Sequence, residues 1–342
     1  MSTPVQRRRA SISDVARLAE VSVGTVSNVL NRPDRVSPAT RDRVLGAIED
    51  LAFVPNGSAR QLRAGTITTA GAIVLDVANP FFTDVARGIE DRLTQDDFTV
   101  MLASSDEDPA REARYLRLFE EHGVQGVMVV PSTSDIEHLL TVRRRGIAVV
   151  LLDRPSPVES LSSVAVDDVA GGEMAVQHLL ELGHERIAFL NGPHSIRQCA
   201  DRWTGAVRAV TAAGLDPADA LVEVTIPSLN ADGGEQGTRE LLAMDRVPTA
   251  TFCINDLTAL GALRTLRAEG VSVPHGMAVV GYDDVSFAAE LSTPLTSVRQ
   301  PTHQLGFRAA DLLLAPADAP AEQITFQPEL VVRTSSTGLD PA

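Results

Sequence analysis

The chain has 342 residues, of which 44% are hydrophobic and 22% charged, and this composition is that of a globular protein of two or three domains. It excludes a mainly disordered chain, and no apolar run approaches the roughly 18 residues that span a bilayer, so we expect no membrane protein. The basic run Arg7–Arg9 lacks the apolar segment that would make it a signal peptide. Cys199 and Cys253 are too few for a disulfide framework and form no metal-ligand spacing, which predicts buried thiols in a reducing cytoplasm.

The charge is distributed unevenly. The whole chain carries −15, but residues 1–64 hold ten arginines against six acidic residues, a surplus of +4. The rest of the chain holds 20 basic and 39 acidic residues, a balance of −19, and every basic residue is arginine. A short basic head on a long acidic body predicts that the N-terminal end meets a polyanion.

Three short helices are predicted within residues 11–54. Ser11 and Asp14 have capping-box spacing, the second helix begins after Ser22, and the third begins after Ser37 with proline at its first position. Only a short turn separates the first two helices, as in a helix-turn-helix, whose second helix enters the major groove of DNA. An ordinary three-helix bundle would explain the apolar spacing but not the surplus of arginine.

The sequence of this head is specific. Residues 12–19 read ISDVARLA, residues 21–31 read VSVGTVSNVLN, and the pattern continues through VSPATRDRV at 36–44 and FVPN at 53–56. This stretch resembles the headpiece of the LacI/GalR (lactose-repressor) family of bacterial transcription regulators. The resemblance implies a cytoplasmic regulator, most often a repressor, that binds a palindromic operator as a homodimer and needs no cofactor.

The resemblance also assigns DNA contacts. The family's base-reading positions are occupied by Val23, Gly24 and Asn28. Positions that contact the phosphate backbone are occupied by Ser22, Thr25, Ser27 and Asn31. Many members carry arginine at the position of Asn28. Arginine favours guanine, whereas asparagine suits adenine, and Gly24 has no side chain with which to read a base. The operator preference at these positions therefore stays open.

Residues 55–64 resemble the hinge helix of the family, and residues 1–10 are expected to form a disordered basic tail. Leu62 falls where family members insert a leucine between base pairs of the minor groove, and Asn56 is assigned to DNA as well. An apolar wedge of this kind unstacks a base step and kinks the duplex. Alternatively, Leu62 is only the apolar face of a linker helix.

The body, residues 68–338, alternates short apolar runs with helical stretches, which indicates parallel strands buried on both faces. The cycle repeats after Asp167, which predicts an α/β domain of two doubly wound parallel-sheet lobes with a crevice at the carboxyl ends of the strands. The first lobe is expected at about 68–165 and 295–328, and the second at about 166–292 and 329–338. The crossing between lobes is implied by the resemblance, because the family's effector domain is similar to periplasmic sugar-binding proteins.

Polar and aromatic side chains follow the predicted strands, where the crevice should lie. The candidate effector-binding residues are Phe81, Phe82, Asp153, Arg154, Arg202, Asn255 and Asp283. Aromatic rings stack on apolar faces, and arginine, amide and carboxylate groups hydrogen-bond vicinal hydroxyls. Each polar residue taken alone could instead be a helix N-cap or a surface ion pair. We expect a sugar effector, with a purine or nucleoside corepressor as the alternative.

Two other classes of protein are disfavoured. An exported sugar-binding protein would not carry the headpiece, and a sugar-metabolising enzyme would need a motif that is missing: the sequence has no Walker loop, GxSxG, HExxH or Cys/His metal spacing. Asp283 and Asp284 are adjacent after a strand and should point apart, which disfavours a catalytic pair. The C-terminal residues form no leucine heptad, which disfavours a tetramer.

Overall fold

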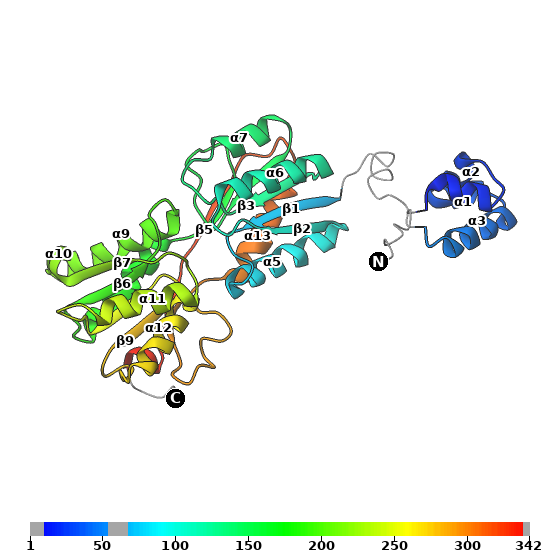
Figure 1. Ribbon diagram of the computed structural model, residues 1–342. Coiled ribbons are helices and arrows are strands. Elements are labelled where there is room, and N and C mark those ends of the chain that lie inside the picture. Colours follow the sequence, from blue (N-terminus) through cyan, green and yellow to red (C-terminus); the bar gives the residue numbers. More distant parts are fainter. Residues whose placement is uncertain (1–9, 54–67, 338–342) are drawn as a thin grey trace. The chain divides into compact units, whose positions relative to one another are not determined.

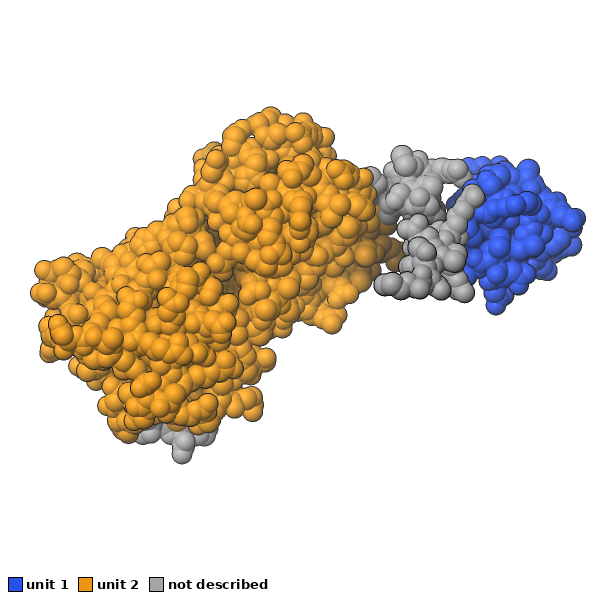
Figure 2. Space-filling view, viewed as in Figure 1, with its two compact units in different colours: residues 1–67 blue, residues 68–342 orange. Residues whose placement is uncertain are grey.

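The computed structural model describes residues 10–53 and 68–337, and the chain divides into two compact units, residues 1–67 and 68–342 (Figure 2). The expectations for the basic tail, the hinge helix at 55–64, Asn56 and Leu62 fall outside the described residues. No helix in the described part of the chain is long and apolar enough to cross a membrane.

The first unit contains the three expected helices. They are α1 (Ile12–Leu18), α2 (Val23–Asn31) and α3 (Pro38–Asp50), with a short 3-10 turn, η1 (Pro33–Arg35), before α3. Ser11, Ser22 and Ser37 each cap a helix by accepting a hydrogen bond from the backbone N–H three residues ahead. The three predicted starts are therefore confirmed. The apolar faces form one small core of Val15, Ala16, Ala19, Val26, Val29, Val44 and Ala47.

The second unit is built on two six-stranded sheets, with strand orders β11-β5-β4-β3-β1-β2 and β12-β10-β9-β8-β6-β7. The first sheet contains β1 (Thr69–Val74), β2 (Thr99–Ser104), β3 (Gly126–Val129), β4 (Ala148–Leu152), β5 (Ser163–Val166) and β11 (Gln323–Phe326). The second contains β6 (Ile187–Asn191), β7 (Leu221–Thr225), β8 (Ala250–Cys253), β9 (Ala278–Asp283), β10 (Thr296–Arg299) and β12 (Glu329–Val331). Strand pairing is parallel except between β10 and β12, which confirms two mainly parallel lobes.

Helices cover both faces of each sheet (Figure 1). Those of the first lobe are α5 (Pro80–Leu93), with the 3-10 turn η2 (Thr94–Asp96) after it, α6 (Pro109–His122), α7 (Glu137–Arg144) and α13 (Thr302–Leu313). Those of the second are α8 (Asp168–Glu181), α9 (Arg197–Ala212), α10 (Pro217–Ala220), α11 (Ala231–Leu242), α12 (Asp256–Ala268) and α14 (Thr334–Thr337). Helices α8 and α9 cross closely, since a Cβ at Gly172 would lie 2.2 Å from the Arg202 carbonyl oxygen.

The expected lobe boundary near residue 295 is wrong. Strand β10 pairs in parallel with β9, with Thr296 opposite Val280, so it belongs to the second lobe. The chain crosses back to the first lobe only after Arg299, on its way to α13. A strand of four residues does not reveal from its own sequence which of two sheets it joins. No strand was expected at β5, β7 or β11, which are four or five residues long.

Candidate functional site

Helix α2 presents one face to solvent. Val26 and Val29 are buried in the core of the first unit, whereas Ser22, Val23, Gly24, Asn28 and Asn31 are exposed, and Thr25 and Ser27 are half-buried. The seven expected DNA contacts of the second helix therefore lie on its accessible side. Val23 is 42% exposed, which leaves an apolar side chain without a packing role at the start of the helix.

The polar groups on this face differ in availability. Ser22 Oγ accepts a hydrogen bond from the Thr25 N–H at 3.1 Å, and Asn31 Nδ2 donates to the Ser27 carbonyl at 2.8 Å. The Asn28 carboxamide makes no hydrogen bond with any described residue. Asn28 is therefore the amide on α2 that is free to pair with a base edge.

Gly24 is not demanded by the packing of this unit. A Cβ added there would meet only Ser22 Oγ, at an ordinary 3.6 Å. Glycine inside a helix costs stability relative to alanine. A glycine that its own fold does not require suits a surface that another molecule approaches closely.

The described headpiece has no surplus of positive charge. Residues 10–53 hold five arginines and six acidic residues, so the +4 of residues 1–64 comes from arginines at 7–9, 60 and 63, outside the described residues. Arg17 is also paired, with Asp14. The exposed face of α2 itself has no charged residue and presents hydroxyls, amides and the apolar Val23.

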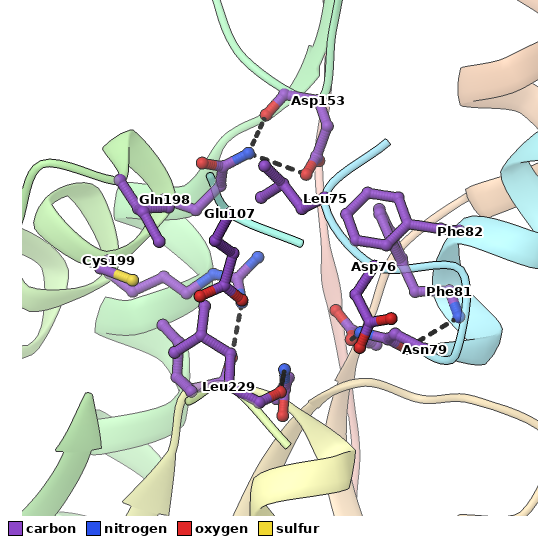
Figure 3. Close-up of a pocket in the computed structure, with 15 residues that line it drawn as sticks. Leu75, Asp76, Asn79, Phe81, Phe82, Glu107, Asp153, Gln198, Cys199 and Leu229 are labelled. Carbon is purple, nitrogen blue, oxygen red and sulfur yellow. Dashed lines mark hydrogen bonds between the residues drawn. The ribbon is translucent and has the colours of Figure 1, made fainter. Parts of the chain in front are cut away.

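The second unit holds a cavity of about 50 Å³ between the lobes (Figure 3). Six of the seven expected effector residues line it: Phe81, Phe82, Asp153, Arg202, Asn255 and Asp283. They come from the segments after β1, β4 and β8, from α9, and from the end of β9. The cavity thus lies at the carboxyl ends of the parallel strands, where ligands bind in open α/β sheets.

Arg202 is 5% exposed and is held within the second lobe. Its Nε donates to Asp168 Oδ1 at 2.8 Å and its Nη1 to the Ile254 carbonyl at 2.6 Å, while its guanidinium carbon lies 3.5 Å from the ring centre of Tyr282. Burial by itself would lower the pKa of Arg202, but the Asp168 carboxylate keeps it above its ordinary value. Nη2 makes no hydrogen bond with the described residues and remains for a ligand.

Asp283 joins the lobes. Its Oδ2 accepts from Asn79 Nδ2 of the first lobe at 3.3 Å, and its Oδ1 from Gln300 Nε2 at 2.8 Å. Burial raises the pKa of Asp283 to about 6, against the opposing effect of Arg202. Asp284 faces the other way and pairs with Arg299 and Arg333. The two carboxylates therefore point apart, as expected.

Asp153 and Gln198 form a second link between lobes. Gln198 Nε2 donates to the Asp153 carbonyl at 2.7 Å and to its Oδ2 at 2.8 Å. Asp153 Oδ1 and Gln198 Oε1 are buried with no partner in the described structure. Burial and the nearby carboxylate of Asp168 raise the pKa of Asp153. Unpaired buried acceptors are costly, so this cavity is suited to a ligand that donates hydrogen bonds.

Arg154 is the one expected effector residue that does not line this cavity. Its side chain is buried but does not line the cavity, because Nη1 donates to the Thr133 carbonyl at 2.7 Å. Asp153 has a left-handed backbone (φ 57°), which turns the chain so that successive side chains diverge. Asn255 lines the cavity, yet its amide is engaged: Oδ1 caps α12 by accepting from Thr258 N–H, and Nδ2 donates to the Leu229 carbonyl.

An apolar wall completes the cavity. Phe81 and Phe82 are buried and meet edge to face, with ring centres 4.9 Å apart. Asn79 caps α5 by accepting a hydrogen bond from the Phe81 N–H at 3.0 Å, and this cap fixes the start of the helix that carries both rings. Leu75, Ile196, Leu229 and Ile254 add to the apolar lining. Such a mixture of apolar wall and few polar groups is typical of small-molecule sites.

Comparison with known proteins decides the family. Residues 11–56 match bacterial regulatory proteins of the lacI family, and residues 176–336 match a periplasmic binding protein-like domain. The chain is 33% identical to the HTH-type transcriptional repressor PurR of Photobacterium profundum, over 97% of this chain and 100% of that protein. The chain belongs to the lacI family. It is a DNA-binding transcriptional repressor of that family.

Solved lacI-family structures resemble this one over nearly the whole chain. The complex of the transcriptional regulator CelR with cellobiose is 33% identical, with a TM-score of 0.71, covering 96% of this chain and 100% of that one. The lac repressor dimer bound to operator and the anti-inducer ONPF is 27% identical, with a TM-score of 0.76, covering 96% and 99%. The predicted fold class is confirmed.

The sequence did not single out several residues of this lacI-family cavity. Asp76, Glu107, Gln198 and Cys199 line it as well. Asp76 and Glu107 follow β1 and β2, so position after a strand could have pointed to them. Gln198 and Cys199 lie in the first turn of α9, which carried no such signal.

Proposed function

We propose that this lacI-family repressor binds a palindromic operator as a homodimer in the cytoplasm, and that a sugar bound between its lobes controls that binding. The observation that carries the proposal is the cavity between the two lobes, across which Asn79 bonds to Asp283 and Gln198 to Asp153. A ligand that contacts these four side chains changes how the lobes are held together. Its differential affinity for the two lobe arrangements is what can switch the protein.

The DNA side of the proposal uses the exposed face of α2. Val23, Gly24 and Asn28 would read bases, and Ser22, Thr25, Ser27 and Asn31 would hold the phosphate backbone. Asn56 and Leu62 would act in the hinge, with Leu62 as a minor-groove wedge. The operator-bound lac repressor dimer supports operator binding by a dimer.

A sugar is favoured by the cavity's polar groups. Asp153 Oδ1 and Gln198 Oε1 need donors, which hydroxyls supply, and Arg202 Nη2 can donate to a hydroxyl or ring oxygen. Phe81 or Phe82 would cover an apolar sugar face. The cellobiose complex of CelR, similar over the whole chain, supports this class of effector.

A purine or nucleoside corepressor is the second candidate. The two phenyl rings in the lining suit the face of a base, and a relative named PurR is 33% identical to this chain. A corepressor would strengthen operator binding, whereas an inducing sugar would weaken it.

We further propose that the protein is a regulator and not an enzyme, since its full-length relatives are regulators. Asp283 and Asp284 point apart, so they do not support a catalytic pair.

The test is a thermal-shift screen of the full chain with monosaccharides, disaccharides, nucleobases and nucleosides. A ligand that binds only the folded state raises the melting temperature. Each hit is then added to the protein on DNA selected from a random palindromic library. A sugar that both stabilises the protein and alters DNA binding supports the proposal. Stabilisation by nucleobases or nucleosides alone would contradict the sugar effector and support the purine or nucleoside corepressor.

A further inference from the structure

The cavity carries an imbalance of charge. Four carboxylic acids line it, Asp76, Glu107, Asp153 and Asp283, together with one cation, Arg202. Arg202 is itself paired with Asp168 at 2.8 Å. A ligand therefore enters a space whose own side chains hold more negative than positive charge.

Glu107 has the fewest polar partners of these acids among the described residues. It is half-buried and makes no hydrogen bond or ion pair with the described residues. Its neighbour Asp106 differs, since it accepts from Ser104 Oγ at 2.6 Å and pairs with Arg111. Asp76 uses one oxygen to accept from the Ala78 N–H at 2.8 Å and pairs with no described cation.

The backbone at Glu107 has an unfavourable conformation. Asp106 and Glu107 are both left-handed, with φ of 49° and 61°. Left-handed backbone is unfavourable for glutamate and persists only where neighbouring contacts enforce it. The residues on both sides of Glu107 are anchored. Asp106 accepts a hydrogen bond from Ser104 Oγ, and Asp108 caps α6 by accepting from the Ala110 N–H. Backbone strain of this kind concentrates at functional sites.

Glu107 and Asp76 face one cavity (Figure 3) and interact electrostatically. Burial, together with the carboxylates of Asp76 and Asp106, raises the pKa of Glu107 to about 7. A cation placed between Glu107 and Asp76 would relieve this repulsion.

A second observation, independent of these two acids, points to the same ligand. Asp153 is 4% exposed, lines the same cavity, and leaves Oδ1 without a partner in the described structure. A buried acid oxygen without a partner is satisfied by a polar group that the ligand brings. Asp153 thus points to a polar ligand in this cavity, and Glu107 and Asp76 favour positive charge on it.

We propose that Glu107 and Asp76 form a subsite for a protonated amine, so that the effector is an amino sugar and anionic sugars are rejected. This inference rests on the proposed sugar effector. An ammonium group offers three donors and a charge that matches the two carboxylates. A neutral hydroxyl leaves the negative charge of the two carboxylates uncompensated, and a phosphate would be repelled by them.

The experiment compares matched ligands by titration calorimetry on the full chain at pH 7. The pairs are glucose and glucosamine, galactose and galactosamine, and cellobiose and its diamino analogue, with glucose 6-phosphate as the anion. We expect the amine of at least one pair to bind roughly 10- to 100-fold tighter than its neutral partner. Glu107→Gln and Asp76→Asn should each remove most of that preference.

Glu121→Gln is the matched control, because Glu121 is exposed on α6 of the same lobe and does not line the cavity. This variant should keep the preference for the amine. A neutral or phosphorylated sugar that binds as tightly as its amine, or a preference that survives in both Glu107→Gln and Asp76→Asn, overturns the inference and leaves a sugar effector standing. Binding of none of the sugars contradicts the sugar effector itself.

Discussion

Asn79 Nδ2 donates a hydrogen bond to Asp283 Oδ2 at 3.3 Å, and the two residues lie 204 positions apart in different lobes. Both line the cavity, so the atoms that join the lobes are also atoms that a ligand can reach. Ligand binding and lobe arrangement are therefore coupled through the same side chains.

Asp283→Asn should weaken binding of the effector found by the thermal-shift screen by roughly tenfold or more, because a charged acceptor is lost in a desolvated site. Asp284→Asn is the matched control. Asp284 pairs with Arg299 and Arg333 away from the cavity, so its loss should lower the melting temperature and leave affinity near that of the parent. Calorimetry and thermal denaturation measure both. Equal affinity of the Asp283→Asn variant and the parent would remove Asp283 from the site.

Stability should depend on pH through Asp283. Burial raises its pKa to about 6 in the folded chain, above the ordinary value near 4 that the unfolded chain keeps. As the pH falls from 7 to 5, the folded chain takes up a proton that the unfolded chain does not. The Asp283 contribution to the free energy of unfolding should therefore rise by roughly 1 kcal/mol over this window. Urea unfolding of parent and Asp283→Asn at both pH values isolates this contribution, which a parallel response of the two proteins would contradict.

Arg202→Ala should destabilise the body. It leaves the buried Asp168 carboxylate without its cation, at a cost of about 3–5 kcal/mol. Arg197→Ala on the same helix α9 is the control, because Arg197 is exposed and its pair with Asp201 should contribute less than about 1 kcal/mol. Urea denaturation compares them. A similar decrease in the free energy of unfolding in both variants would show that the buried pair stabilises the fold no more than the exposed one.

Asn28→Ala should reduce discrimination at one position of each half-site by about 1–3 kcal/mol. Asn31→Ala is the comparison, since a contact to phosphate affects all DNA sequences alike. Binding to a set of single-base operator variants, measured by fluorescence anisotropy, separates the two effects. An unchanged ranking of operators in Asn28→Ala would refute the base-reading role.

Gly24→Ala should stabilise α2 by roughly 0.5–1 kcal/mol, since the added methyl meets only Ser22 Oγ at 3.6 Å. The same methyl should weaken operator binding if DNA approaches the helix closely at this point. Amide hydrogen exchange of α2 and anisotropy with operator DNA measure the two effects. Unaltered DNA affinity would show that glycine is not needed there.

The sequence alone determined the headpiece and the class of the body. The helix starts at Ser11, Ser22 and Ser37 depend on contacts between residues three apart, which a linear pattern contains in full. Strands of a parallel sheet are buried on both faces and are therefore apolar, so the short apolar runs predict parallel sheets. Six of the seven predicted effector residues line the cavity, because parallel strands bring their carboxyl ends to one edge.

Only the tertiary structure decided what each of those residues contacts. The assignment of β10 to the second sheet depends on its pairing with β9, and the Arg202–Asp168 pair on the close crossing of α8 and α9. Asp153 enters the cavity while Arg154 leaves it because the backbone turns left-handed at Asp153. Glu107 is directed by two consecutive left-handed residues, which no composition signals. Orientation in a crevice is set by such single dihedral angles and by partners distant in the chain, whereas local periodicity records only which face of an element is buried.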